Sequence, residues 1–264
     1  MNKEKEQSKG EFKKVLGLGS LICFGLAYMA PTVVFNYYGS ISVESHGMYP
    51  MVFLCTVIAI FFTAFSYASM TSVFQKSGSA YVYVQQSLNP HFGFLTGWVM
   101  MLDYVLLPMI CFLLVGIYMN TYFPMVPVAV WVVLLVVMCF LINAKGVSGT
   151  AKADTAIVVA QMIMMAVFIV AGLITIAQGG IDGTSNGFID GTAFYNPEYF
   201  ELRLVLYPAA MLCVSFLGFD AVSTLSEEAK NPKKDIPKAI VQVCLGTGLI
   251  FTFIAYIAQV MWPV

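Results

Sequence analysis

The stretch GLAYMAPTVVF, which runs from Gly25 to Phe35, places a proline near the centre of a long apolar segment. That segment begins near Val15 and reaches Ile41. Pro31 has no N–H to donate, and its ring crowds the carbonyl four residues earlier, which costs about 3 kcal/mol inside a helix. In lipid the cost is greater because no water can replace the lost hydrogen bond. The stretch therefore predicts a broken helix.

The composition indicates an integral membrane protein. Of the 264 residues, 59% are hydrophobic and 10% are charged, whereas a soluble domain carries about 25% charged residues. The six cysteines stand singly in apolar segments and the two histidines are far apart, so we expect neither disulfides nor a metal site. No phosphate loop, nucleophile triad or zinc motif is present. We therefore expect no enzyme activity, no cofactor and no nucleic-acid partner.

Seven apolar segments are long enough to cross a bilayer, which takes about 20 apolar residues. The lysine-rich residues 1–14 precede a run too long for a signal peptide, so we interpret them as a cytoplasmic tail before a retained first span. The predicted spans are Val15–Ile41, Met51–Met70, His91–Met119, Val128–Asn143, Thr155–Ala177, Leu204–Leu225 and Ala239–Trp262.

The basic residues predict the orientation of these spans. Of the 13 Lys and Arg residues, all but Arg203 fall on one side of the membrane in this arrangement. That side is cytoplasmic by the positive-inside rule, which predicts a multi-pass plasma-membrane protein with its N-terminus inside. Residues 178–203, rich in Gly, Asn and Asp, should form an irregular external loop. The internal segment KSGSAYVYVQQSLNP after the second span should include a short amphipathic helix.

A second break is predicted in the sixth span. SFLGFDAVSTLSEE puts Gly218 and Asp220 inside an apolar run. A lone mid-span proline could simply kink a packed helix, which membranes tolerate. Matching breaks five spans apart instead favour an inverted repeat of five helices, whose unwound backbone lines a substrate site. Pro31 would then lie in the first turn of the outer half-helix, where its missing N–H costs nothing.

The predicted fold is therefore all-α and polytopic, with an inverted repeat that stops after about seven helices. Residues 15–177 would form the first repeat and residues 204–264 the start of the second. Ten spans are needed for both repeats, so we expect either a fragment or a truncated gene product that does not transport by itself.

Three stretches resemble the amino acid–polyamine–organocation permeases, and the resemblance covers the whole chain. They are GSAYVYVQQSLNPHFGFLTGWVMMLDY, NAKGVSGTAKADTA and SFLGFDAVSTLSEEAKNPKKDIPKAI. Within that family GLAYMAPTVVF, LDYVLLP and SFLGFDAVSTLSEE are most similar to bacterial putrescine importers. The resemblance implies a leucine-transporter-like fold and a secondary transporter that imports a cationic amine by alternating access, coupled to a proton or another ion. A proton-coupled amino acid permease is the alternative.

Two departures from the family pattern bear on the substrate. Many relatives carry G-x-G at the first break, where bare N–H groups hold a carboxylate, but Met29, Ala30 and Pro31 stand here. Some proton-coupled relatives carry a lysine in the fifth span where this chain has Gln161. Both differences favour a cationic substrate over a zwitterion.

Two aspartates lie inside predicted spans. Asp103 is near the middle of the third span and Asp220 is at the second break, and no Lys or Arg shares their depth. An ionised side chain there costs about 2.5–3.5 kcal/mol and needs a partner, which a bound amine or a proton would supply. Alternatively, Asp220 caps the inner half-helix, and Asp103 bonds a neighbouring helix near Pro108.

The remaining candidates surround the two breaks. Phe216 and Phe219 could stack on an ammonium group, or could face lipid or core. Asp220 shares a helical face with three residues that would line the inner pathway, or form a solvated helix end. An intramembrane aspartyl protease is disfavoured because the G-x-G-D signature is incomplete, and a non-transporting subunit stays open. The predicted substrate site is Tyr28, Met29, Ala30, Pro31, Thr32, Asp103, Phe216, Gly218, Phe219 and Asp220, and the predicted inner pathway is Ser223, Thr224, Glu227 and Glu228.

Overall fold

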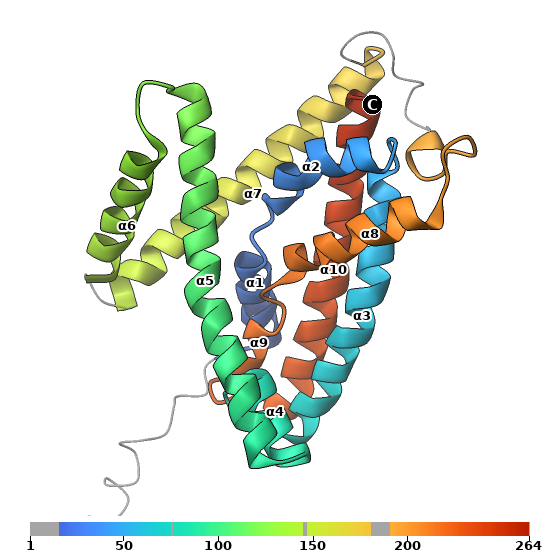
Figure 1. Ribbon diagram of the computed structural model, residues 1–264. Helices are drawn as coiled ribbons and strands as arrows, with labels where there is room; N and C mark the ends of the chain where they lie inside the picture. The colour runs from blue at the N-terminus through green and yellow to red at the C-terminus, as the bar shows by residue number, and fades with distance from the viewer. Residues whose placement is uncertain (1–15, 75, 145–146, 181–190, 264) are drawn as a thin grey trace, which may run out of the picture. The chain divides into compact units, whose positions relative to one another are not determined.

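The computed structural model describes residues 16–74, 76–144, 147–180 and 191–263. The predicted tail, Lys145 and residues 181–190 of the predicted external loop lie outside these ranges. The regular elements of the described residues are helices, as predicted (Figure 1). They are α1 (Leu18–Tyr28), α2 (Val33–Glu44), α3 (Tyr49–Val73), α4 (Ser79–Ser87), α5 (Pro90–Tyr122), α6 (Val128–Ala144), α7 (Val147–Ala177), α8 (Leu202–Leu212), α9 (Ala221–Thr224) and α10 (Pro232–Met261), with short 3-10 turns η2 (Gly191–Ala193) and η3 (Cys213–Phe216).

Five helical segments of the described residues are long and apolar enough to cross a membrane: α3, α5, α10, α7 from Thr155, and Leu202–Thr224. The bent pair α1 and α2 makes a sixth if it counts as one span. The predicted fourth span is α6, an apolar helix of 17 residues. The polytopic all-α prediction is therefore confirmed, while the inverted repeat stays a prediction.

Two helices extend beyond the spans predicted for them. α7 begins at Val147 and α10 begins at Pro232, several residues before the predicted spans. Hydropathy marks where a helix leaves the lipid, but a helix can continue into water with polar residues. For α10 the start is set by a proline in the first turn, where the missing N–H has no intrahelical partner to lose.

The chain divides into two compact units, which are described separately. The first contains Met1–Ser79 and Gln161–Val264, and thus residues of both predicted repeats; the second is Ala80–Ala160. In the second unit α5 and α6 pack together, and a Cβ at Gly116 would lie 3.0 Å from Val132. This small residue allows the two helices to approach closely, as is common between membrane helices.

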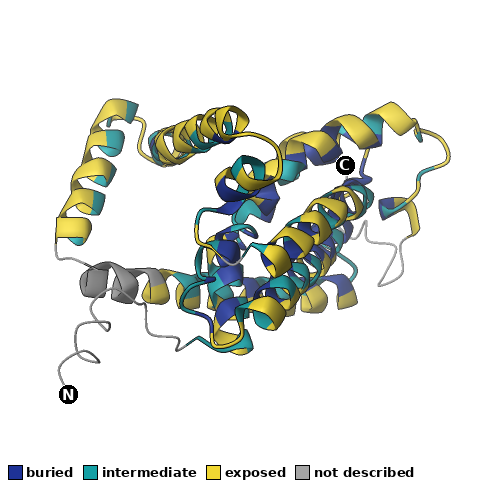
Figure 2. Ribbon diagram, turned by 90° about the horizontal axis from the view of Figure 1, so that it is seen from below, coloured by how far each residue is buried: buried dark blue, intermediate teal, exposed yellow. Residues whose placement is uncertain are grey.

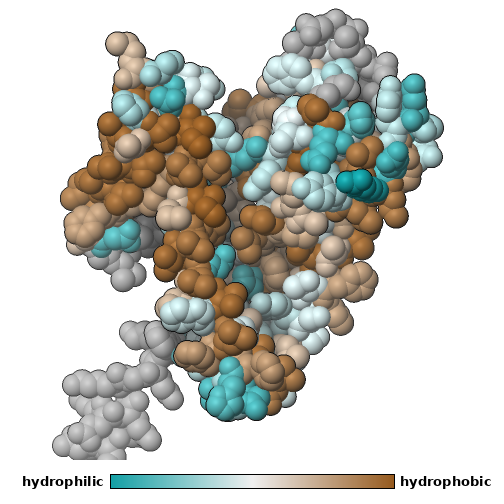
Figure 3. All heavy atoms as spheres, viewed as in Figure 1, coloured by the Kyte–Doolittle hydropathy of each residue, from teal (hydrophilic) through white to brown (hydrophobic). Residues whose placement is uncertain are grey.

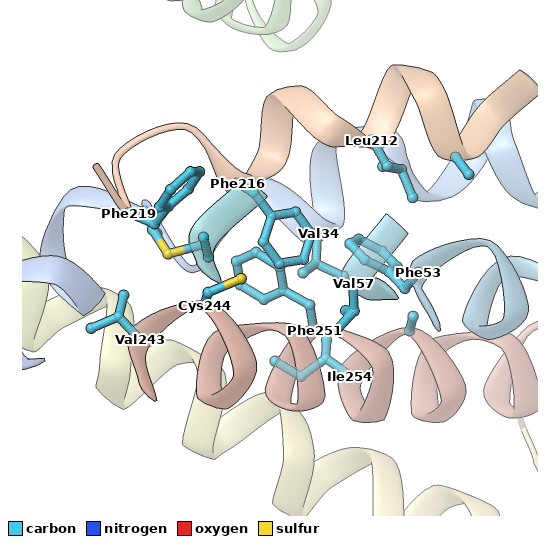
Figure 4. Close-up of a cluster of buried hydrophobic side chains, with 14 of the residues drawn as sticks. Val34, Phe53, Val57, Leu212, Phe216, Phe219, Val243, Cys244, Phe251 and Ile254 are labelled. Atoms are coloured by element: carbon cyan, nitrogen blue, oxygen red, sulfur yellow. The ribbon is translucent and has the colours of Figure 1, made fainter. Parts of the chain in front are cut away.

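In the first unit α10 runs along α3 and also contacts α1, α2 and α9 (Figure 1). Their contact faces form a core with fully buried Phe53, Phe216 and Phe251 (Figure 4). Many helices have one buried and one exposed face (Figure 2). The exposed faces carry large apolar side chains, which colour much of the visible surface brown in Figure 3. Such faces are expected where lipid is the solvent.

Candidate functional site

The first span is broken where predicted. α1 ends at Tyr28 and α2 begins at Val33, and the two helices are bent by 49°. Ala30 has a positive φ of 42°, which is uncommon for a residue with a side chain. The N–H of Val33 donates to the carbonyl of Ala30 at 2.9 Å and closes a turn. The four residues between the helices, Met29 to Thr32, are therefore non-helical.

Pro31 does not lie in the first turn of α2, so that expectation was wrong. Thr32 is the N-cap residue, and Pro31 is the second residue of the turn that begins at Ala30. Thr32, with φ −76° and ψ −7°, has the dihedral angles of the third position of a type I turn. Proline is favoured immediately before it because its ring fixes the required φ. The residue therefore builds the turn itself.

The sixth span is broken as predicted, and more extensively. α8 passes into η3, the chain opens at Leu217 with ψ 133°, and Gly218 adopts a positive φ of 111°. The inner half is one turn of α-helix, α9. It is followed by backbone hydrogen bonds between residues three positions apart: the N–H of Leu225 donates to the carbonyl of Val222, and that of Glu228 to the carbonyl of Leu225. After α9 the chain therefore tightens to about three residues per turn, and the predicted inner pathway stays a prediction.

The two breaks touch each other. A Cβ at Gly218 would lie 2.9 Å from the carbonyl oxygen of Tyr28, so only glycine fits there. Below the breaks, Leu16 donates its N–H to Glu228 at 3.1 Å and accepts from the N–H of Lys230 at 2.9 Å. The two breaks are therefore in direct backbone contact at Gly218, while the substrate site expected between them stays a prediction.

The first break presents two carbonyl acceptors and one N–H donor. The N–H groups of Met29, Ala30 and Val33 are bonded to carbonyls of the same segment and Pro31 has none, whereas the N–H of Thr32 donates to no carbonyl among the described residues. Among the described residues, the carbonyls of Tyr28 and Met29 accept no backbone N–H. These carbonyls lie at the C-terminal end of α1, which carries the negative end of the helix dipole. This backbone can attract a cation.

The side chains at the first break divide into buried and exposed ones. Met29 and Pro31 are buried, Thr32 is half-buried, and Ala30 is exposed. Tyr28 is 53% exposed, with its ring 5.3 Å from that of Phe24. Tyr28 is thus an aromatic side chain at this break that a ligand could reach.

Asp220 is held by a serine from the segment after α3. The hydroxyl of Ser79 donates to Oδ2 of Asp220 at 3.1 Å. Asp220 occupies the N-cap position of α9 but makes no side-chain cap bond, so the capping alternative is not seen. Among the described residues no basic side chain forms an ion pair with it.

The predicted inner-pathway residues meet the same segment. Ser77 donates its hydroxyl to the carbonyl of Thr224 at 2.7 Å and its N–H to Oε1 of Glu227 at 3.2 Å. We call Ser77–Ser79 the clamp. The sequence did not reveal it because Ser79 and Asp220 are 141 residues apart, and this stretch indicated only an internal segment with a short amphipathic helix.

Three further buried hydroxyls lie near the second break, and of these the sequence pointed only to Ser223. Ser223 is fully buried, and its hydroxyl has no hydrogen-bond partner among the described residues. The same holds for Ser215 in η3 and Thr247 in α10. Glu228 is half-buried. The described residues contain no cluster of side chains suited to a metal ion.

Phe216 and Phe219 pack into the core instead of facing an open site. Phe216 is fully buried, with its ring 5.7 Å from that of Phe251. Phe219 is edge-on to Tyr67 at 5.5 Å. Figure 4 shows both rings among buried apolar side chains. Of the two alternatives for these residues, the structure supports core packing.

Asp103 lies on α5 in the second unit, where its residue is exposed. Asp220 belongs to the first unit, so the prediction that both carboxylates contact one substrate stays a prediction. Gln161 is a half-buried residue of α7, and its Oε1 has no hydrogen-bond partner among the described residues.

Comparison with known proteins identifies transporters. The family model described as "Amino acid permease" matches residues 17–264. The low-affinity putrescine importer PlaP of Escherichia coli K12 is 36% identical over 97% of this chain and 56% of its own length. A methylthioribose transporter of Bacillus subtilis is 25% identical over 94% of this chain and 54% of its own length. The branched-chain amino acid permease BcaP of Lactococcus lactis is 22% identical over 96% and 57%, respectively. The chain thus spans about half the length of these relatives.

Proposed function

This chain belongs to the amino acid permease family, and from that premise we propose that the protein is a secondary transporter that imports a cationic amine such as putrescine. The proposed site lies in the plasma membrane at the two broken spans, and alternating access coupled to a proton or another ion moves the substrate. The relative with 36% identity is itself named a putrescine importer.

One observation supports the choice of a cation: the first break holds two carbonyls that accept no backbone N–H among the described residues. A carboxylate needs N–H donors, and of this break's N–H groups three are already bonded and Pro31 has none, which leaves only that of Thr32. An ammonium group needs acceptors, and the carbonyls of Tyr28 and Met29 supply them at the negative end of α1. Asp220, which has no basic partner among the described residues, supplies the charge.

A diamine also suits two separated carboxylates. It carries a positive charge at each end, with apolar methylenes between. We propose Asp220 and Asp103 as the two anionic partners and Tyr28 as an aromatic neighbour, since a desolvated ammonium on an aromatic face gains about 0.5–2 kcal/mol. A zwitterion would leave one of these carboxylates without a partner.

A proton-coupled amino acid permease is the second candidate, and one observation favours it. The N–H groups of Gly218 and Phe219 at the second break donate to no backbone carbonyl among the described residues. They could hold a substrate carboxylate. Uptake of labelled putrescine and of labelled arginine and leucine by the protein expressed at full length decides between the candidates.

Replacing the proposed charge partners tests the amine site. Asp220→Asn and Asp103→Asn should each weaken the apparent affinity for putrescine by about 1.5–3 kcal/mol, the range for a hydrogen bond to a charged group. Asp235→Asn is the control, because Asp235 lies in the first turn of α10, away from the breaks. Uptake kinetics normalised to the amount of protein in the membrane provide the measurement. Unchanged affinity in both variants, or preference for a neutral amino acid, would exclude the amine site.

A further inference from the structure

We propose that Ser79 is a positioning residue for Asp220, and that the clamp holds the inner part of the sixth span in its binding geometry. The inference rests on the proposed function, because it assigns Asp220 to the substrate. Its new element is a specificity determinant contributed by Ser79, the first residue of α4.

The clamp contacts α9 and the residues beside it at three points. Its contacts are the Asp220 carboxylate, the Thr224 carbonyl and the Glu227 carboxylate, all at hydrogen-bond distance. α9 has only four residues, and an isolated helix of that length is not stable in itself. Packing and hydrogen bonds from elsewhere must therefore keep it in place. The clamp supplies three such bonds, and Tyr67 adds the ring contact to Phe219.

The backbone of the clamp points to a defined geometry. Ser79 has a positive φ of 49° and follows Gly78 with φ 135°. Residues with a side chain seldom adopt a positive φ, so packing or hydrogen bonds must hold Ser79 there. Ser79 is also fully buried. Its hydroxyl therefore reaches Asp220 from a fixed position.

The hydrogen bond leaves part of the carboxylate available. Ser79 occupies one site on Oδ2, and an ionised carboxylate has about four lone-pair sites. The bond restricts rotation of the carboxylate while its other oxygen can still accept from an ammonium group. A pre-oriented acceptor binds more tightly because less side-chain freedom is lost on binding.

Removal of the hydroxyl should raise KM for putrescine. Ser79→Gly removes it and fits the positive φ, whereas Ser79→Ala removes it and strains the backbone. We expect both variants to raise KM about threefold to tenfold, the range for one hydrogen bond, with Vmax unchanged within about twofold. Ser72→Ala is the matched control, because the hydroxyl of Ser72 bonds only within α3, to the Ser69 carbonyl.

A double-variant cycle separates positioning from a general loss of structure. If Ser79 acts through Asp220, adding Ser79→Gly to Asp220→Asn should not raise KM further. The inference is overturned if Ser79→Gly has a wild-type KM, or if the rise in KM of the double variant is the product of the rises in the two single variants. If Ser79→Gly does not reach the membrane, Ser79→Cys, with a weaker donor, should give an intermediate KM, and a wild-type KM there overturns the inference equally.

Failure of the proposed function has a different signature. A wild-type protein that carries a neutral amino acid and not putrescine contradicts the amine proposal. The same cycle is then measured with that amino acid: non-additive effects support positioning of Asp220 by Ser79, and additive effects overturn it.

Discussion

Gly218 shows how one residue couples the two broken spans. Its positive φ of 111° is a conformation that side chains rarely adopt, and its missing Cβ makes room for the carbonyl of Tyr28. The same carbonyl accepts no backbone N–H among the described residues. Gly218 therefore both shapes the second break and brings it against the acceptors of the first.

Gly218→Ala should destabilise the protein by about 2–5 kcal/mol, from backbone strain together with overpacking against a backbone carbonyl. Gly179→Ala is the matched control, because Gly179 also has a positive φ of 99° but has nothing within 4 Å of an added Cβ. That control should lose only the strain, about 1–2 kcal/mol. Thermal unfolding in detergent measures both variants, and equal losses would mean that the contact with Tyr28 is unimportant.

At the scale of elements, α3 and α10 form the longest contact of the first unit. Gly248 of α10 allows it: a Cβ there would lie 2.5 Å from a methyl group of Val57 and 3.3 Å from the ring of Phe216. Gly25 plays the same part between α1 and its neighbours, because a Cβ there would lie 2.7 Å from a methyl group of Val222. Close approach at small residues lets dispersion replace the hydrophobic effect that lipid does not provide.

Gly248→Ala should therefore cost about 1–3 kcal/mol of stability through overpacking. The added methyl group meets Val57, so Val57→Ala in the same chain should recover part of the loss. Gly246→Ala is the control in the same helix, because an added Cβ there has nothing within 4 Å. It should be neutral or gain up to about 1 kcal/mol from helix propensity. Thermal unfolding in detergent is measured for the unchanged protein, Gly248→Ala, the double variant with Val57→Ala, and Gly246→Ala. A Gly248→Ala variant as stable as the unchanged protein would contradict tight α3–α10 packing.

At the scale of the molecule, contacts in the first unit agree with the predicted sidedness. The inner end of the predicted first span meets a segment predicted to be cytoplasmic, since Leu16 pairs with Lys230. A second such segment meets the same end, since Ser77 bonds Glu227. Segments predicted to be external also meet, since the ring of His46 stacks on Tyr199 at 4.9 Å. The contacts thus join segments predicted to lie on the same side of the membrane. The basic residues alone predict which of the two sides is cytoplasmic.

Cysteine labelling tests the orientation. In intact cells a membrane-impermeant maleimide should label Asn186→Cys and should not label Lys76→Cys, Lys145→Cys or Lys233→Cys until the membrane is permeabilised. Positions 145 and 186 lie outside the described residues, so the charge pattern alone supports them. The protein without added cysteines provides the background from its six native ones. Labelling of position 145 in sealed cells would reverse the topology.

The sequence by itself determined the helical class, the approximate place of the long apolar helices and both breaks. These features have local causes: long apolar runs, a proline that lacks an N–H, and a glycine in an apolar span. The basic residues likewise predict sidedness without any tertiary contact. The family resemblance, carried by the same stretches, was confirmed by comparison.

Only the tertiary structure decided which groups the breaks present. Membrane helices are apolar on the lipid face and on the core face, so no periodicity told us that Phe216 and Phe219 pack inward while Tyr28 stays exposed. Which carbonyls stay free depends on the turn that Pro31 forms. The bond from Ser79 to Asp220 joins residues 141 positions apart. Such a partner is chosen by how the helices pack, because in a local stretch of sequence many serines would serve equally well.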